Sequence, residues 1–297
     1  MIVLILTKQK PTEYETSRLV DSFTTKGIKT IVANPNKFDI IVDKDIRQGI
    51  KYEGQTIELP DLVLLRQGAG ISNFQLAVIR QFEQIGIPCV NSSVSVDVVK
   101  DKLRSSQILS REGIAIPSTM LVRHPVDDKL VSSNIGFPCV IKVVTGSYGE
   151  GIHFCESKRD FKRIMEFIET LDNKKTLVVQ EYMGERPGED LRVLVIGGKV
   201  LGVMKRTAPE GDFRANITRG GTGESFPTSP EIEETAIKTA KVLGLEIAGI
   251  DLLFDTHGFR VCEANSNPGF SGFEKYCHAD VADNITDYII NKLLNRS

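Results

Sequence analysis

The stretch Asp251 to Lys275 reads DLLFDTHGFRVCEANSNPGFSGFEK, and the end of this chain is organised around it. Two short apolar runs flank Thr256-His257-Gly258, a spacing typical of a β-hairpin whose three-residue loop ends in a left-handed glycine. Pairing outward from such a loop sets Asp251 opposite Glu263, and period-2 alternation puts Asn265 on the same face as Glu263. The sequence therefore predicts that two acids and an amide converge.

Like charges that face each other on a sheet repel, so this acidic pair needs a cation or a proton between its members. An all-oxygen set of two carboxylates and an amide suits Mg²⁺, which prefers one or two carboxylates together with substrate phosphates and water. Asp251, Glu263 and Asn265 are therefore candidate metal ligands. The alternative is an ordinary hairpin face whose acids lie in solvent.

The composition gives no strong overall charge of either sign. The 297 residues include 37 Lys and Arg and 39 Asp and Glu, a formal net charge of −2. This balance argues against nucleic acid and membrane surfaces as partners. The opening MIVLILTKQK is too short and lacks the basic leader of a signal peptide, and no apolar segment reaches the roughly 18 residues of a membrane span, so we expect a buried first strand.

The five cysteines are odd in number and show no C-x-x-C spacing. Most of them sit inside apolar runs, so they are expected to be buried, reduced thiols. Reduced thiols are typical of the cytoplasm, which is therefore the expected location.

The first 95 residues alternate between apolar strand patterns and helical spacing. Strands are predicted near 1–6, 31–33, 62–65 and 88–90, with helices over 13–26 and 73–85 and a hairpin-like insertion around Gly54. This alternation predicts a small parallel sheet. Thr7-Lys8-Gln9-Lys10 follows the first strand where a dinucleotide-binding domain would have G-x-G-x-x-G, so a dinucleotide site is not expected.

Two lysines stand out in the next segment. A basic helix is predicted over 97–111, and Lys102 on it could be an ordinary solvated charge. Lys142 lies inside the apolar strand CVIKVV and needs an anion nearby, or must lose its proton. The glycine-rich stretch 145–151 follows directly and is predicted to be a hairpin flap whose backbone N–H groups cover phosphates. No Gly-Lys-Ser/Thr closes it, so it is not a Walker A loop.

The segment from 185 onward begins with a predicted strand pair, 190–196 and 199–205, joined at Gly197-Gly198. A polar loop with three arginines follows over 206–222, and it either binds anions or lies in solvent. A helix over 231–243 leads into the acidic hairpin, the residues Gly272 to Lys275 are read as a turn, and a helix over 282–294 ends the series.

Several motifs stand in one order along the chain: Lys102, Lys142 before the flap, Gln180-Glu181-Tyr182, Asp190-Leu-Arg192, Arg206, GDFRAN over 211–216, Arg219-Gly-Gly, Gly249-Ile-Asp251, Glu263-Ala-Asn265, Pro268-Gly269 and Gly272-Phe-Glu-Lys275. This series resembles the ATP-grasp superfamily, and within it the RimK-like amino-acid ligases. The resemblance implies an α/β fold, α+β in its ATP-grasp part: a small parallel α/β domain (1–95) and two ATP-grasp lobes, a central one with the flap (96–184) and a C-terminal one with the metal and substrate site (185–297).

The resemblance also implies a role for each matching residue. Arg206 and Lys142 would act on the transferred phosphoryl group, and two Mg²⁺ or Mn²⁺ ions would bind Asp251, Glu263 and Asn265. ATP would be held by Lys102, Lys142, Gly146, Ser147, Glu181, Tyr182, Asp190, Arg214 and Asn216. The candidate substrate contacts are Arg192, Arg214, Arg219 and Lys275, of which the resemblance implies Arg214, while Arg219 and Lys275 are added for their positive charge.

The implied reaction is the joining of a carboxylate to an amine. The carboxylate attacks the γ-phosphate of ATP, and the amine then displaces phosphate from the acyl phosphate while ADP remains. The spare guanidiniums of the 206–222 loop favour an acidic amino acid as the amine donor. Two alternatives stay open: a nucleotide-binding regulatory protein and a kinase. The acceptor is a small molecule or the C-terminus of a protein or peptide. A homo-oligomer also stays open. Ala264 and Ser266-Asn267 depart from common family residues without indicating a substrate.

Overall fold

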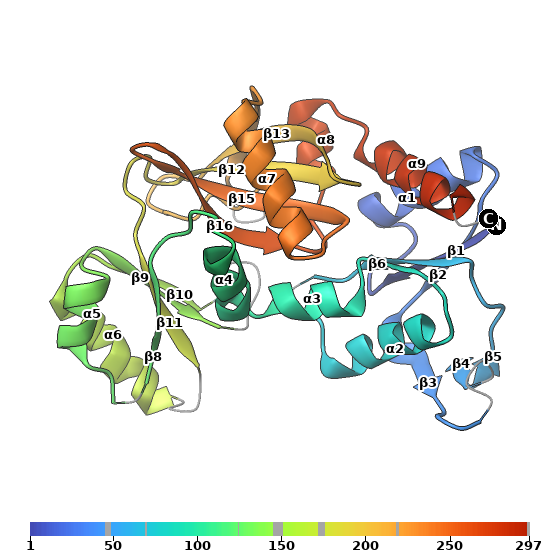
Figure 1. The fold of residues 1–297 in the computed structure, drawn as a ribbon, viewed down its shortest axis with the longest axis horizontal. Helices are drawn as coiled ribbons and strands as arrows, with labels where there is room; N and C mark the ends of the chain where they lie inside the picture. Colours follow the sequence, from blue (N-terminus) through green and yellow to red (C-terminus); the bar gives the residue numbers. More distant parts are fainter. Residues whose placement is uncertain are drawn as a thin grey trace.

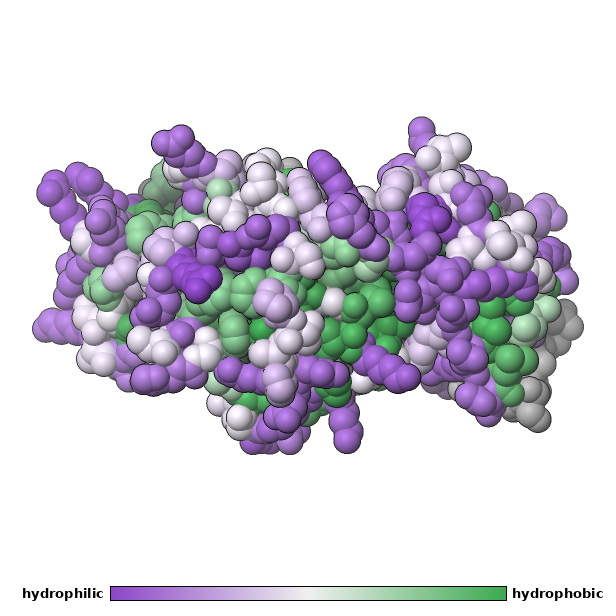
Figure 2. All heavy atoms as spheres, turned by 90° about the horizontal axis from the view of Figure 1, so that it is seen from above, coloured by the Kyte–Doolittle hydropathy of each residue, from purple (hydrophilic) through white to green (hydrophobic). Residues whose placement is uncertain are grey.

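The structure is a computed structural model that describes residues 1–44, 49–68, 70–123, 125–144, 151–171, 176–217 and 220–295. Figure 1 shows an N-terminal domain in blue and teal, a lobe in green, and a C-terminal lobe in yellow to red that lies between them. Polar side chains cover most of the face seen from above in Figure 2, with apolar ones gathered in its middle part. Within the described part of the chain, no helix has the length and apolar character needed to cross a membrane.

The N-terminal domain is built on a parallel sheet in the order β2-β1-β6-β7. Its strands are β1 (Ile2–Thr7), β2 (Lys29–Ala33), β6 (Leu62–Arg66) and β7 (Cys89–Val90), and its helices are α1 (Tyr14–Thr25) and α2 (Asn73–Gln84). Helices on both faces bury the central strands, which explains their continuous apolar runs. The predicted alternation is confirmed.

The predicted insertion around Gly54 is a small antiparallel sheet. The 3₁₀ helix η1 (Pro35–Lys37) leads into β3 (Phe38–Ile40), β4 (Ile50–Tyr52) and β5 (Gln55–Thr56). Glu53 and Gly54 form the tight turn between β4 and β5, both with positive φ. Two successive positive φ values are the mark of a type I′ hairpin turn.

The predicted single helix over 97–111 is wrong, because the chain breaks at Asp101. Two helices, α3 (Ser93–Lys100) and α4 (Lys102–Arg111), meet there. Asp101 has extended backbone angles, and its carboxylate accepts from the N–H groups of Leu103 and Arg104 at 2.9 and 3.0 Å. An aspartate that caps a new helix in this way satisfies two of the first N–H groups. Lys102 thus becomes the first residue of α4.

The green lobe is an antiparallel sheet in the order β10-β9-β11-β8, covered by two helices. The strands are β8 (Thr119–Val122), β9 (Cys139–Val143), β10 (Ile152–Cys155) and β11 (Leu177–Glu181), and the helices are α5 (Asp128–Asn134) and α6 (Lys158–Leu171). Phe161 and Met165 of α6 pack with Val131 of α5 onto the sheet. Most of the predicted flap, residues 145–150, lies outside the described residues.

The C-terminal lobe is an antiparallel sheet in the order β14-β13-β12-β15-β16. Its strands are β12 (Glu189–Ile196), β13 (Lys199–Thr207), β14 (Thr222–Phe226), β15 (Ile247–Asp255) and β16 (Gly258–Asn265). Helix α7 (Pro230–Val242) packs on one face, while α8 (Ser271–Cys277) and α9 (Val281–Leu294) share a core with the other face and with the N-terminal domain. The predicted turn at Gly272 to Lys275 is wrong, since these residues belong to α8.

Candidate functional site

The acidic hairpin has the predicted pairing at the end that carries Asp251 and Glu263, and a different one near its turn. Asp255 pairs with Gly258, so the loop has two residues and not three, and Gly258 reaches φ 121°. Cys262 is an extra residue in β16, a β-bulge between Asp251 and the next residue of β15. The short loop and the bulge shift the register in opposite senses. Asp251 therefore lies opposite Glu263, as predicted.

Asp251 is buried between two arginines from neighbouring strands. It faces Arg192 of β12 in the sheet register, and both carboxylate oxygens accept from that guanidinium. Arg206 of β13 approaches Asp251 at 3.1 Å. It also forms a bidentate pair with Asp190, with bonds of 2.7 and 2.6 Å. Burial opposes the charge on Arg206, but Asp251 and Asp190 raise its pKa above the ordinary value. Two acids and two arginines thus neutralise one another inside the lobe.

Glu263 is paired with the lysine that opens α4. The Lys102 Nζ atom lies 2.5 Å from Glu263 Oε2. The positive charge of Lys102 lowers the pKa of Glu263 to about 2, against the opposing effect of burial. Burial lowers the pKa of Lys102, but Glu263 and its neighbours Cys262 and Asp251 together raise it above the ordinary value, so the lysine stays charged. The helix break at Asp101 places Lys102 where it can reach the hairpin.

Lys142 of β9 points toward the same hairpin from the green lobe. Its Nζ atom donates to Gln180 Oε1 at 2.5 Å and lies 3.7 Å from Cys262 Sγ. Gln180 is buried and is oriented in turn by Thr119, to which it donates at 2.8 Å. Burial raises the pKa of Cys262, so its thiol is neutral. Both hydrogen-bond partners of Lys142 are thus uncharged, and the acid on which its charge acts is Glu263, whose pKa it helps to lower.

The donor set of the hairpin fits a hard divalent cation. Asn265 donates its amide nitrogen to Gly249 O at 3.3 Å and to Asp251 Oδ2 at 3.5 Å, so its amide oxygen, an atom of the type that Mg²⁺ prefers, is not needed for either bond. In the part of the chain that the structure describes, no group of three His, Cys, Asp or Glu side chains could hold a metal. Lys102, Arg192 and Arg206 hold the acids in this structure.

An aromatic wall stands at the end of β11. Tyr182 lies edge-on to Phe154 of β10, with 4.8 Å between ring centroids, and Phe213 approaches both rings at 6.5 and 5.6 Å. Burial raises the pKa of Tyr182. Glu181 next to it accepts from Arg260 of β16 at 2.9 Å. Sequence reasoning missed Phe154, Phe213 and Arg260, although the motif GDFRAN contains Phe213.

The remaining predicted residues lie in different surroundings. Arg214 forms a fork with Asp212 and lies over the Phe213 ring, 5.6 Å from its centroid. Asn216 is half-buried, and its backbone carbonyl accepts from Gly221. Lys275 is exposed on α8, with its Nζ atom 4.9 Å from the Tyr276 ring centroid. Gly146, Ser147 and Arg219 lie outside the described residues.

Comparison with known proteins adds to this geometry. Residues 1–96 match the RimK PreATP-grasp domain, and residues 99–289 match the RimK-like ATP-grasp domain. The chain belongs to the RimK-like ATP-grasp family. This membership confirms the predicted family and fold, and with them the predicted class of enzyme, a ligase that forms amide bonds.

Relatives and solved structures agree with the family. A protein of Aeromonas salmonicida named "Probable alpha-L-glutamate ligase" is 39% identical over 292 residues, 97% of this chain and 96% of the relative. A protein of the same name from Maridesulfovibrio salexigens is 38% identical and covers 93% of this chain and 91% of its own length. The fold matches the ATP-grasp ligase PsnB complexed with a precursor variant, Mg and ADP, at TM-score 0.75 and 21% identity over 98% of each chain. D-alanine–D-alanine ligase from Bacillus anthracis matches at TM-score 0.70 and 18% identity, over 100% of this chain and 98% of that enzyme.

Proposed function

We propose that this chain is an ATP-dependent carboxylate–amine ligase that adds glutamate to a carboxylate acceptor through an acyl phosphate. The observation that carries the proposal is the charged cluster at the acidic hairpin. Two lobes of the molecule contribute to it: α4 and β9 of the 96–184 lobe bring lysines, while β12, β13, β15 and β16 of the C-terminal lobe bring the arginines and acids. Such a set of acids and cations is what phosphoryl transfer needs, because the reaction depends on positioning and charge neutralisation.

Each charged residue of the cluster has a place in that reaction. Asp251, Glu263 and Asn265 would hold Mg²⁺ or Mn²⁺, which supplies charge neutralisation at the phosphates when bound. Lys102 and Lys142 would bind phosphate oxygens. Arg206 would stabilise the charge on the transferred phosphoryl group, and Asp190 holds its guanidinium in a fixed orientation.

The aromatic wall supports a nucleotide base site next to the phosphate site. Phe154, Tyr182 and Phe213 present ring faces and edges at the end of β11, an apolar surface suited to adenine. Arg260 fixes the side chain of Glu181 beside this wall. We propose that the pre-ATP-grasp domain ends at residue 95 and that the lobes 96–184 and 185–297 hold the nucleotide between them.

The donor is proposed to be an acidic amino acid, as the names of the relatives also suggest. Arg192 and Arg214, which pair with Asp251 and Asp212 in the structure, and the exposed Lys275 would supply positive charge, and Arg219 is added from the sequence alone. A guanidinium binds a carboxylate through two parallel bonds, so a neutral analogue would leave a buried cation unpaired. The reduced thiols Cys89, Cys139, Cys155, Cys262 and Cys277, all free in the structure, support a cytoplasmic location.

The decisive experiment measures ADP release with ATP, Mg²⁺, a panel of carboxylate acceptors and either glutamate or glutamine, followed by mass spectrometry of the products. We expect ADP release that depends on the amine and favours glutamate by at least about tenfold in kcat/KM, the minimum for a lost buried charge pair. Equal rates with glutamine would contradict the acidic donor. ADP release that needs no amine, with a phosphorylated product, would identify a kinase, and nucleotide binding without turnover would identify a regulatory protein.

A further inference from the structure

The loop that follows the candidate metal ligands, residues 266–271, is held by the N-terminal domain at three points. Asn91 donates to the carbonyl of Ser266 at 2.7 Å, at the start of the loop. Arg66 donates to the carbonyl of Pro268 at 3.0 Å, in its middle. At its end, the N–H groups of Phe270 and Ser271 donate to Glu15 Oε1 at 2.6 and 3.3 Å. The loop is thus fixed along its whole length.

These three residues share one edge of the parallel sheet. Arg66 is the last residue of β6, Asn91 directly follows β7, and Glu15 lies in the first turn of α1, which follows β1. All of them lie at the carboxyl ends of parallel strands, where open α/β sheets bind their ligands. In this protein a segment of the same chain occupies that edge. The absence of a dinucleotide fingerprint after β1 agrees with this use of the edge.

Glu15 and Arg66 form a buried ion pair under the loop. Arg66 Nη2 lies 2.9 Å from Glu15 Oε2, and their side chains are only 13% and 3% exposed for the acid and the arginine. The guanidinium also lies over the Phe270 ring, 5.2 Å from its centroid. Desolvation offsets most of the attraction in a buried pair, so such a pair adds little to stability. Its clear structural effect is to fix the backbone of the loop, because both partners also bond to it.

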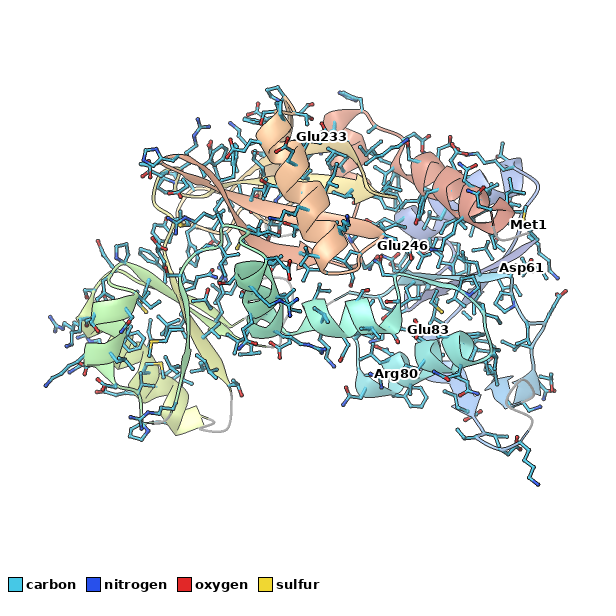
Figure 3. All side chains as sticks on the ribbon, viewed as in Figure 1. Met1, Asp61, Arg80, Glu83, Glu233 and Glu246 are labelled. Carbon is cyan, nitrogen blue, oxygen red and sulfur yellow. The ribbon has the colours of Figure 1, made fainter. Side chains whose placement is uncertain are left out.

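Asn91 connects the loop to the start of β15, the first strand of the acidic hairpin. Its side-chain oxygen accepts from the N–H groups of Glu246 and Ile247 at 2.7 and 3.0 Å, where β15 begins. Its side-chain nitrogen also donates to the carbonyl of Ile247 at 2.7 Å. Glu246, labelled in Figure 3, lies where the C-terminal lobe meets the N-terminal domain. One buried amide therefore joins the entry of β15 to the exit of β16.

We propose that Glu15 and Arg66, with Asn91, are positioning residues for the metal site. They hold the loop that leaves β16 directly after Asn265, and so they fix the position of that ligand relative to Asp251 and Glu263. The N-terminal domain thereby takes part in metal binding without contacting the metal. The assignment of the hairpin as a metal site rests on the proposed function.

The test measures Mn²⁺ binding to the full chain with ADP present, by electron paramagnetic resonance of free Mn²⁺, together with the thermal midpoint. The variants are Glu15→Ala and Arg66→Met, with the conservative Glu15→Gln and Arg66→Lys. Lys26→Met is the matched control, since Lys26 joins α1 to α9 through ion pairs of 2.6 Å with Asp283 and Asp287 and does not touch the loop.

We expect the truncations to weaken Mn²⁺ binding about tenfold, the low end of the effect of groups that support metal ligands, and the conservative variants to weaken it less. Lys26→Met should lower the thermal midpoint and leave the Mn²⁺ dissociation constant unchanged. If the truncations do not fold, Glu15→Gln and Arg66→Lys decide. Unchanged Mn²⁺ binding in folded variants of Glu15 and Arg66 would overturn the positioning role, whatever their stability. Because binding is measured without turnover, this result is separate from a failure of the parent to release ADP with glutamate.

Discussion

Replacing Glu263 by glutamine removes one charge from the cluster and keeps its shape. In the parent, Lys102 lies 2.5 Å from this carboxylate and lowers the pKa of Glu263 from an ordinary 4.5 to about 2. A shift of about two and a half units at about 1.4 kcal/mol per unit sets an upper limit of about 3.5 kcal/mol on the stabilisation by this pair. The Glu263 side chain is 33% exposed, so solvent screening reduces the expected loss to about 1–2 kcal/mol.

The pH dependence of this loss has a definite sign. Because the pKa of Glu263 is lowered on folding, the carboxylate stabilises the native state fully above about pH 4.5 and loses that effect as the pH falls toward about 2. Urea unfolding of the parent and of Glu263→Gln should therefore differ by a constant free energy between pH 7 and 5, and by less at pH 3.5. Glu58→Gln is the matched control, since Glu58 pairs with Lys29 at 2.5 Å but is 58% exposed, and it should change stability little.

Activity gives the second readout for the same variant. An amide in place of a direct carboxylate ligand should raise the Mg²⁺ concentration for half-maximal ADP release at least about a hundredfold, since even supporting groups around a metal change affinity by that order. Steady-state rates over a range of Mg²⁺ at saturating ATP measure this concentration. If Glu263→Gln kept the Mg²⁺ dependence of the parent, the hairpin would not be the metal site. If the stability gap stayed constant down to pH 3.5, the Lys102 pair would not be its cause.

Two further substitutions test the other parts of the cluster. A lysine in place of Arg206 cannot keep both bonds to Asp190 while reaching Asp251. We therefore expect Arg206→Lys to lower kcat about a hundredfold and to change the ADP affinity, measured by calorimetry, only a few-fold. An equal loss of kcat and of ADP affinity would show that Arg206 only binds nucleotide. Asp101→Ala removes the cap that begins α4 and should lower the free energy of unfolding in urea by about 1 kcal/mol. It should also raise the KM for ATP, because Lys102 is the first residue of α4 and loses its fixed position. An unchanged KM would show that the cap does not position Lys102 for ATP.

The sequence predicted the facing acids for a reason that was only partly correct. A three-residue loop without a bulge and a two-residue loop with Cys262 inserted both bring Asp251 opposite Glu263. Hydrophobic alternation fixes which face a side chain points to, but it does not distinguish loop length from a compensating bulge. The helix break at Asp101 left a local signal, an aspartate before a run of helix formers, and the regular apolar spacing on both sides concealed it.

The partners of the acids depend on long-range pairing that no local pattern gives. Arg192 meets Asp251 because β12 pairs with β15, and Arg206 meets Asp190 because β13 pairs with β12; the first of these contacts joins residues 59 positions apart. Glu15 and Arg66 lie still farther from the loop that they hold. Their roles follow from how the domains dock, and the N-terminal pattern predicted only that a parallel sheet would form there.

The acids of the hairpin needed compensating charge, and the expected compensation was a metal ion. In the structure side chains supply it: Lys102 holds Glu263, and Arg192 and Arg206 hold Asp251. The proposed reaction asks for the same groups in other pairings, with the acids on a divalent cation and the basic groups on phosphates. Metal and nucleotide must therefore exchange partners with the cluster together, because either one alone would leave charges of one sign buried and unpaired. Glu263→Gln is informative for this reason, since it removes one acid from the exchange and leaves every cation in place.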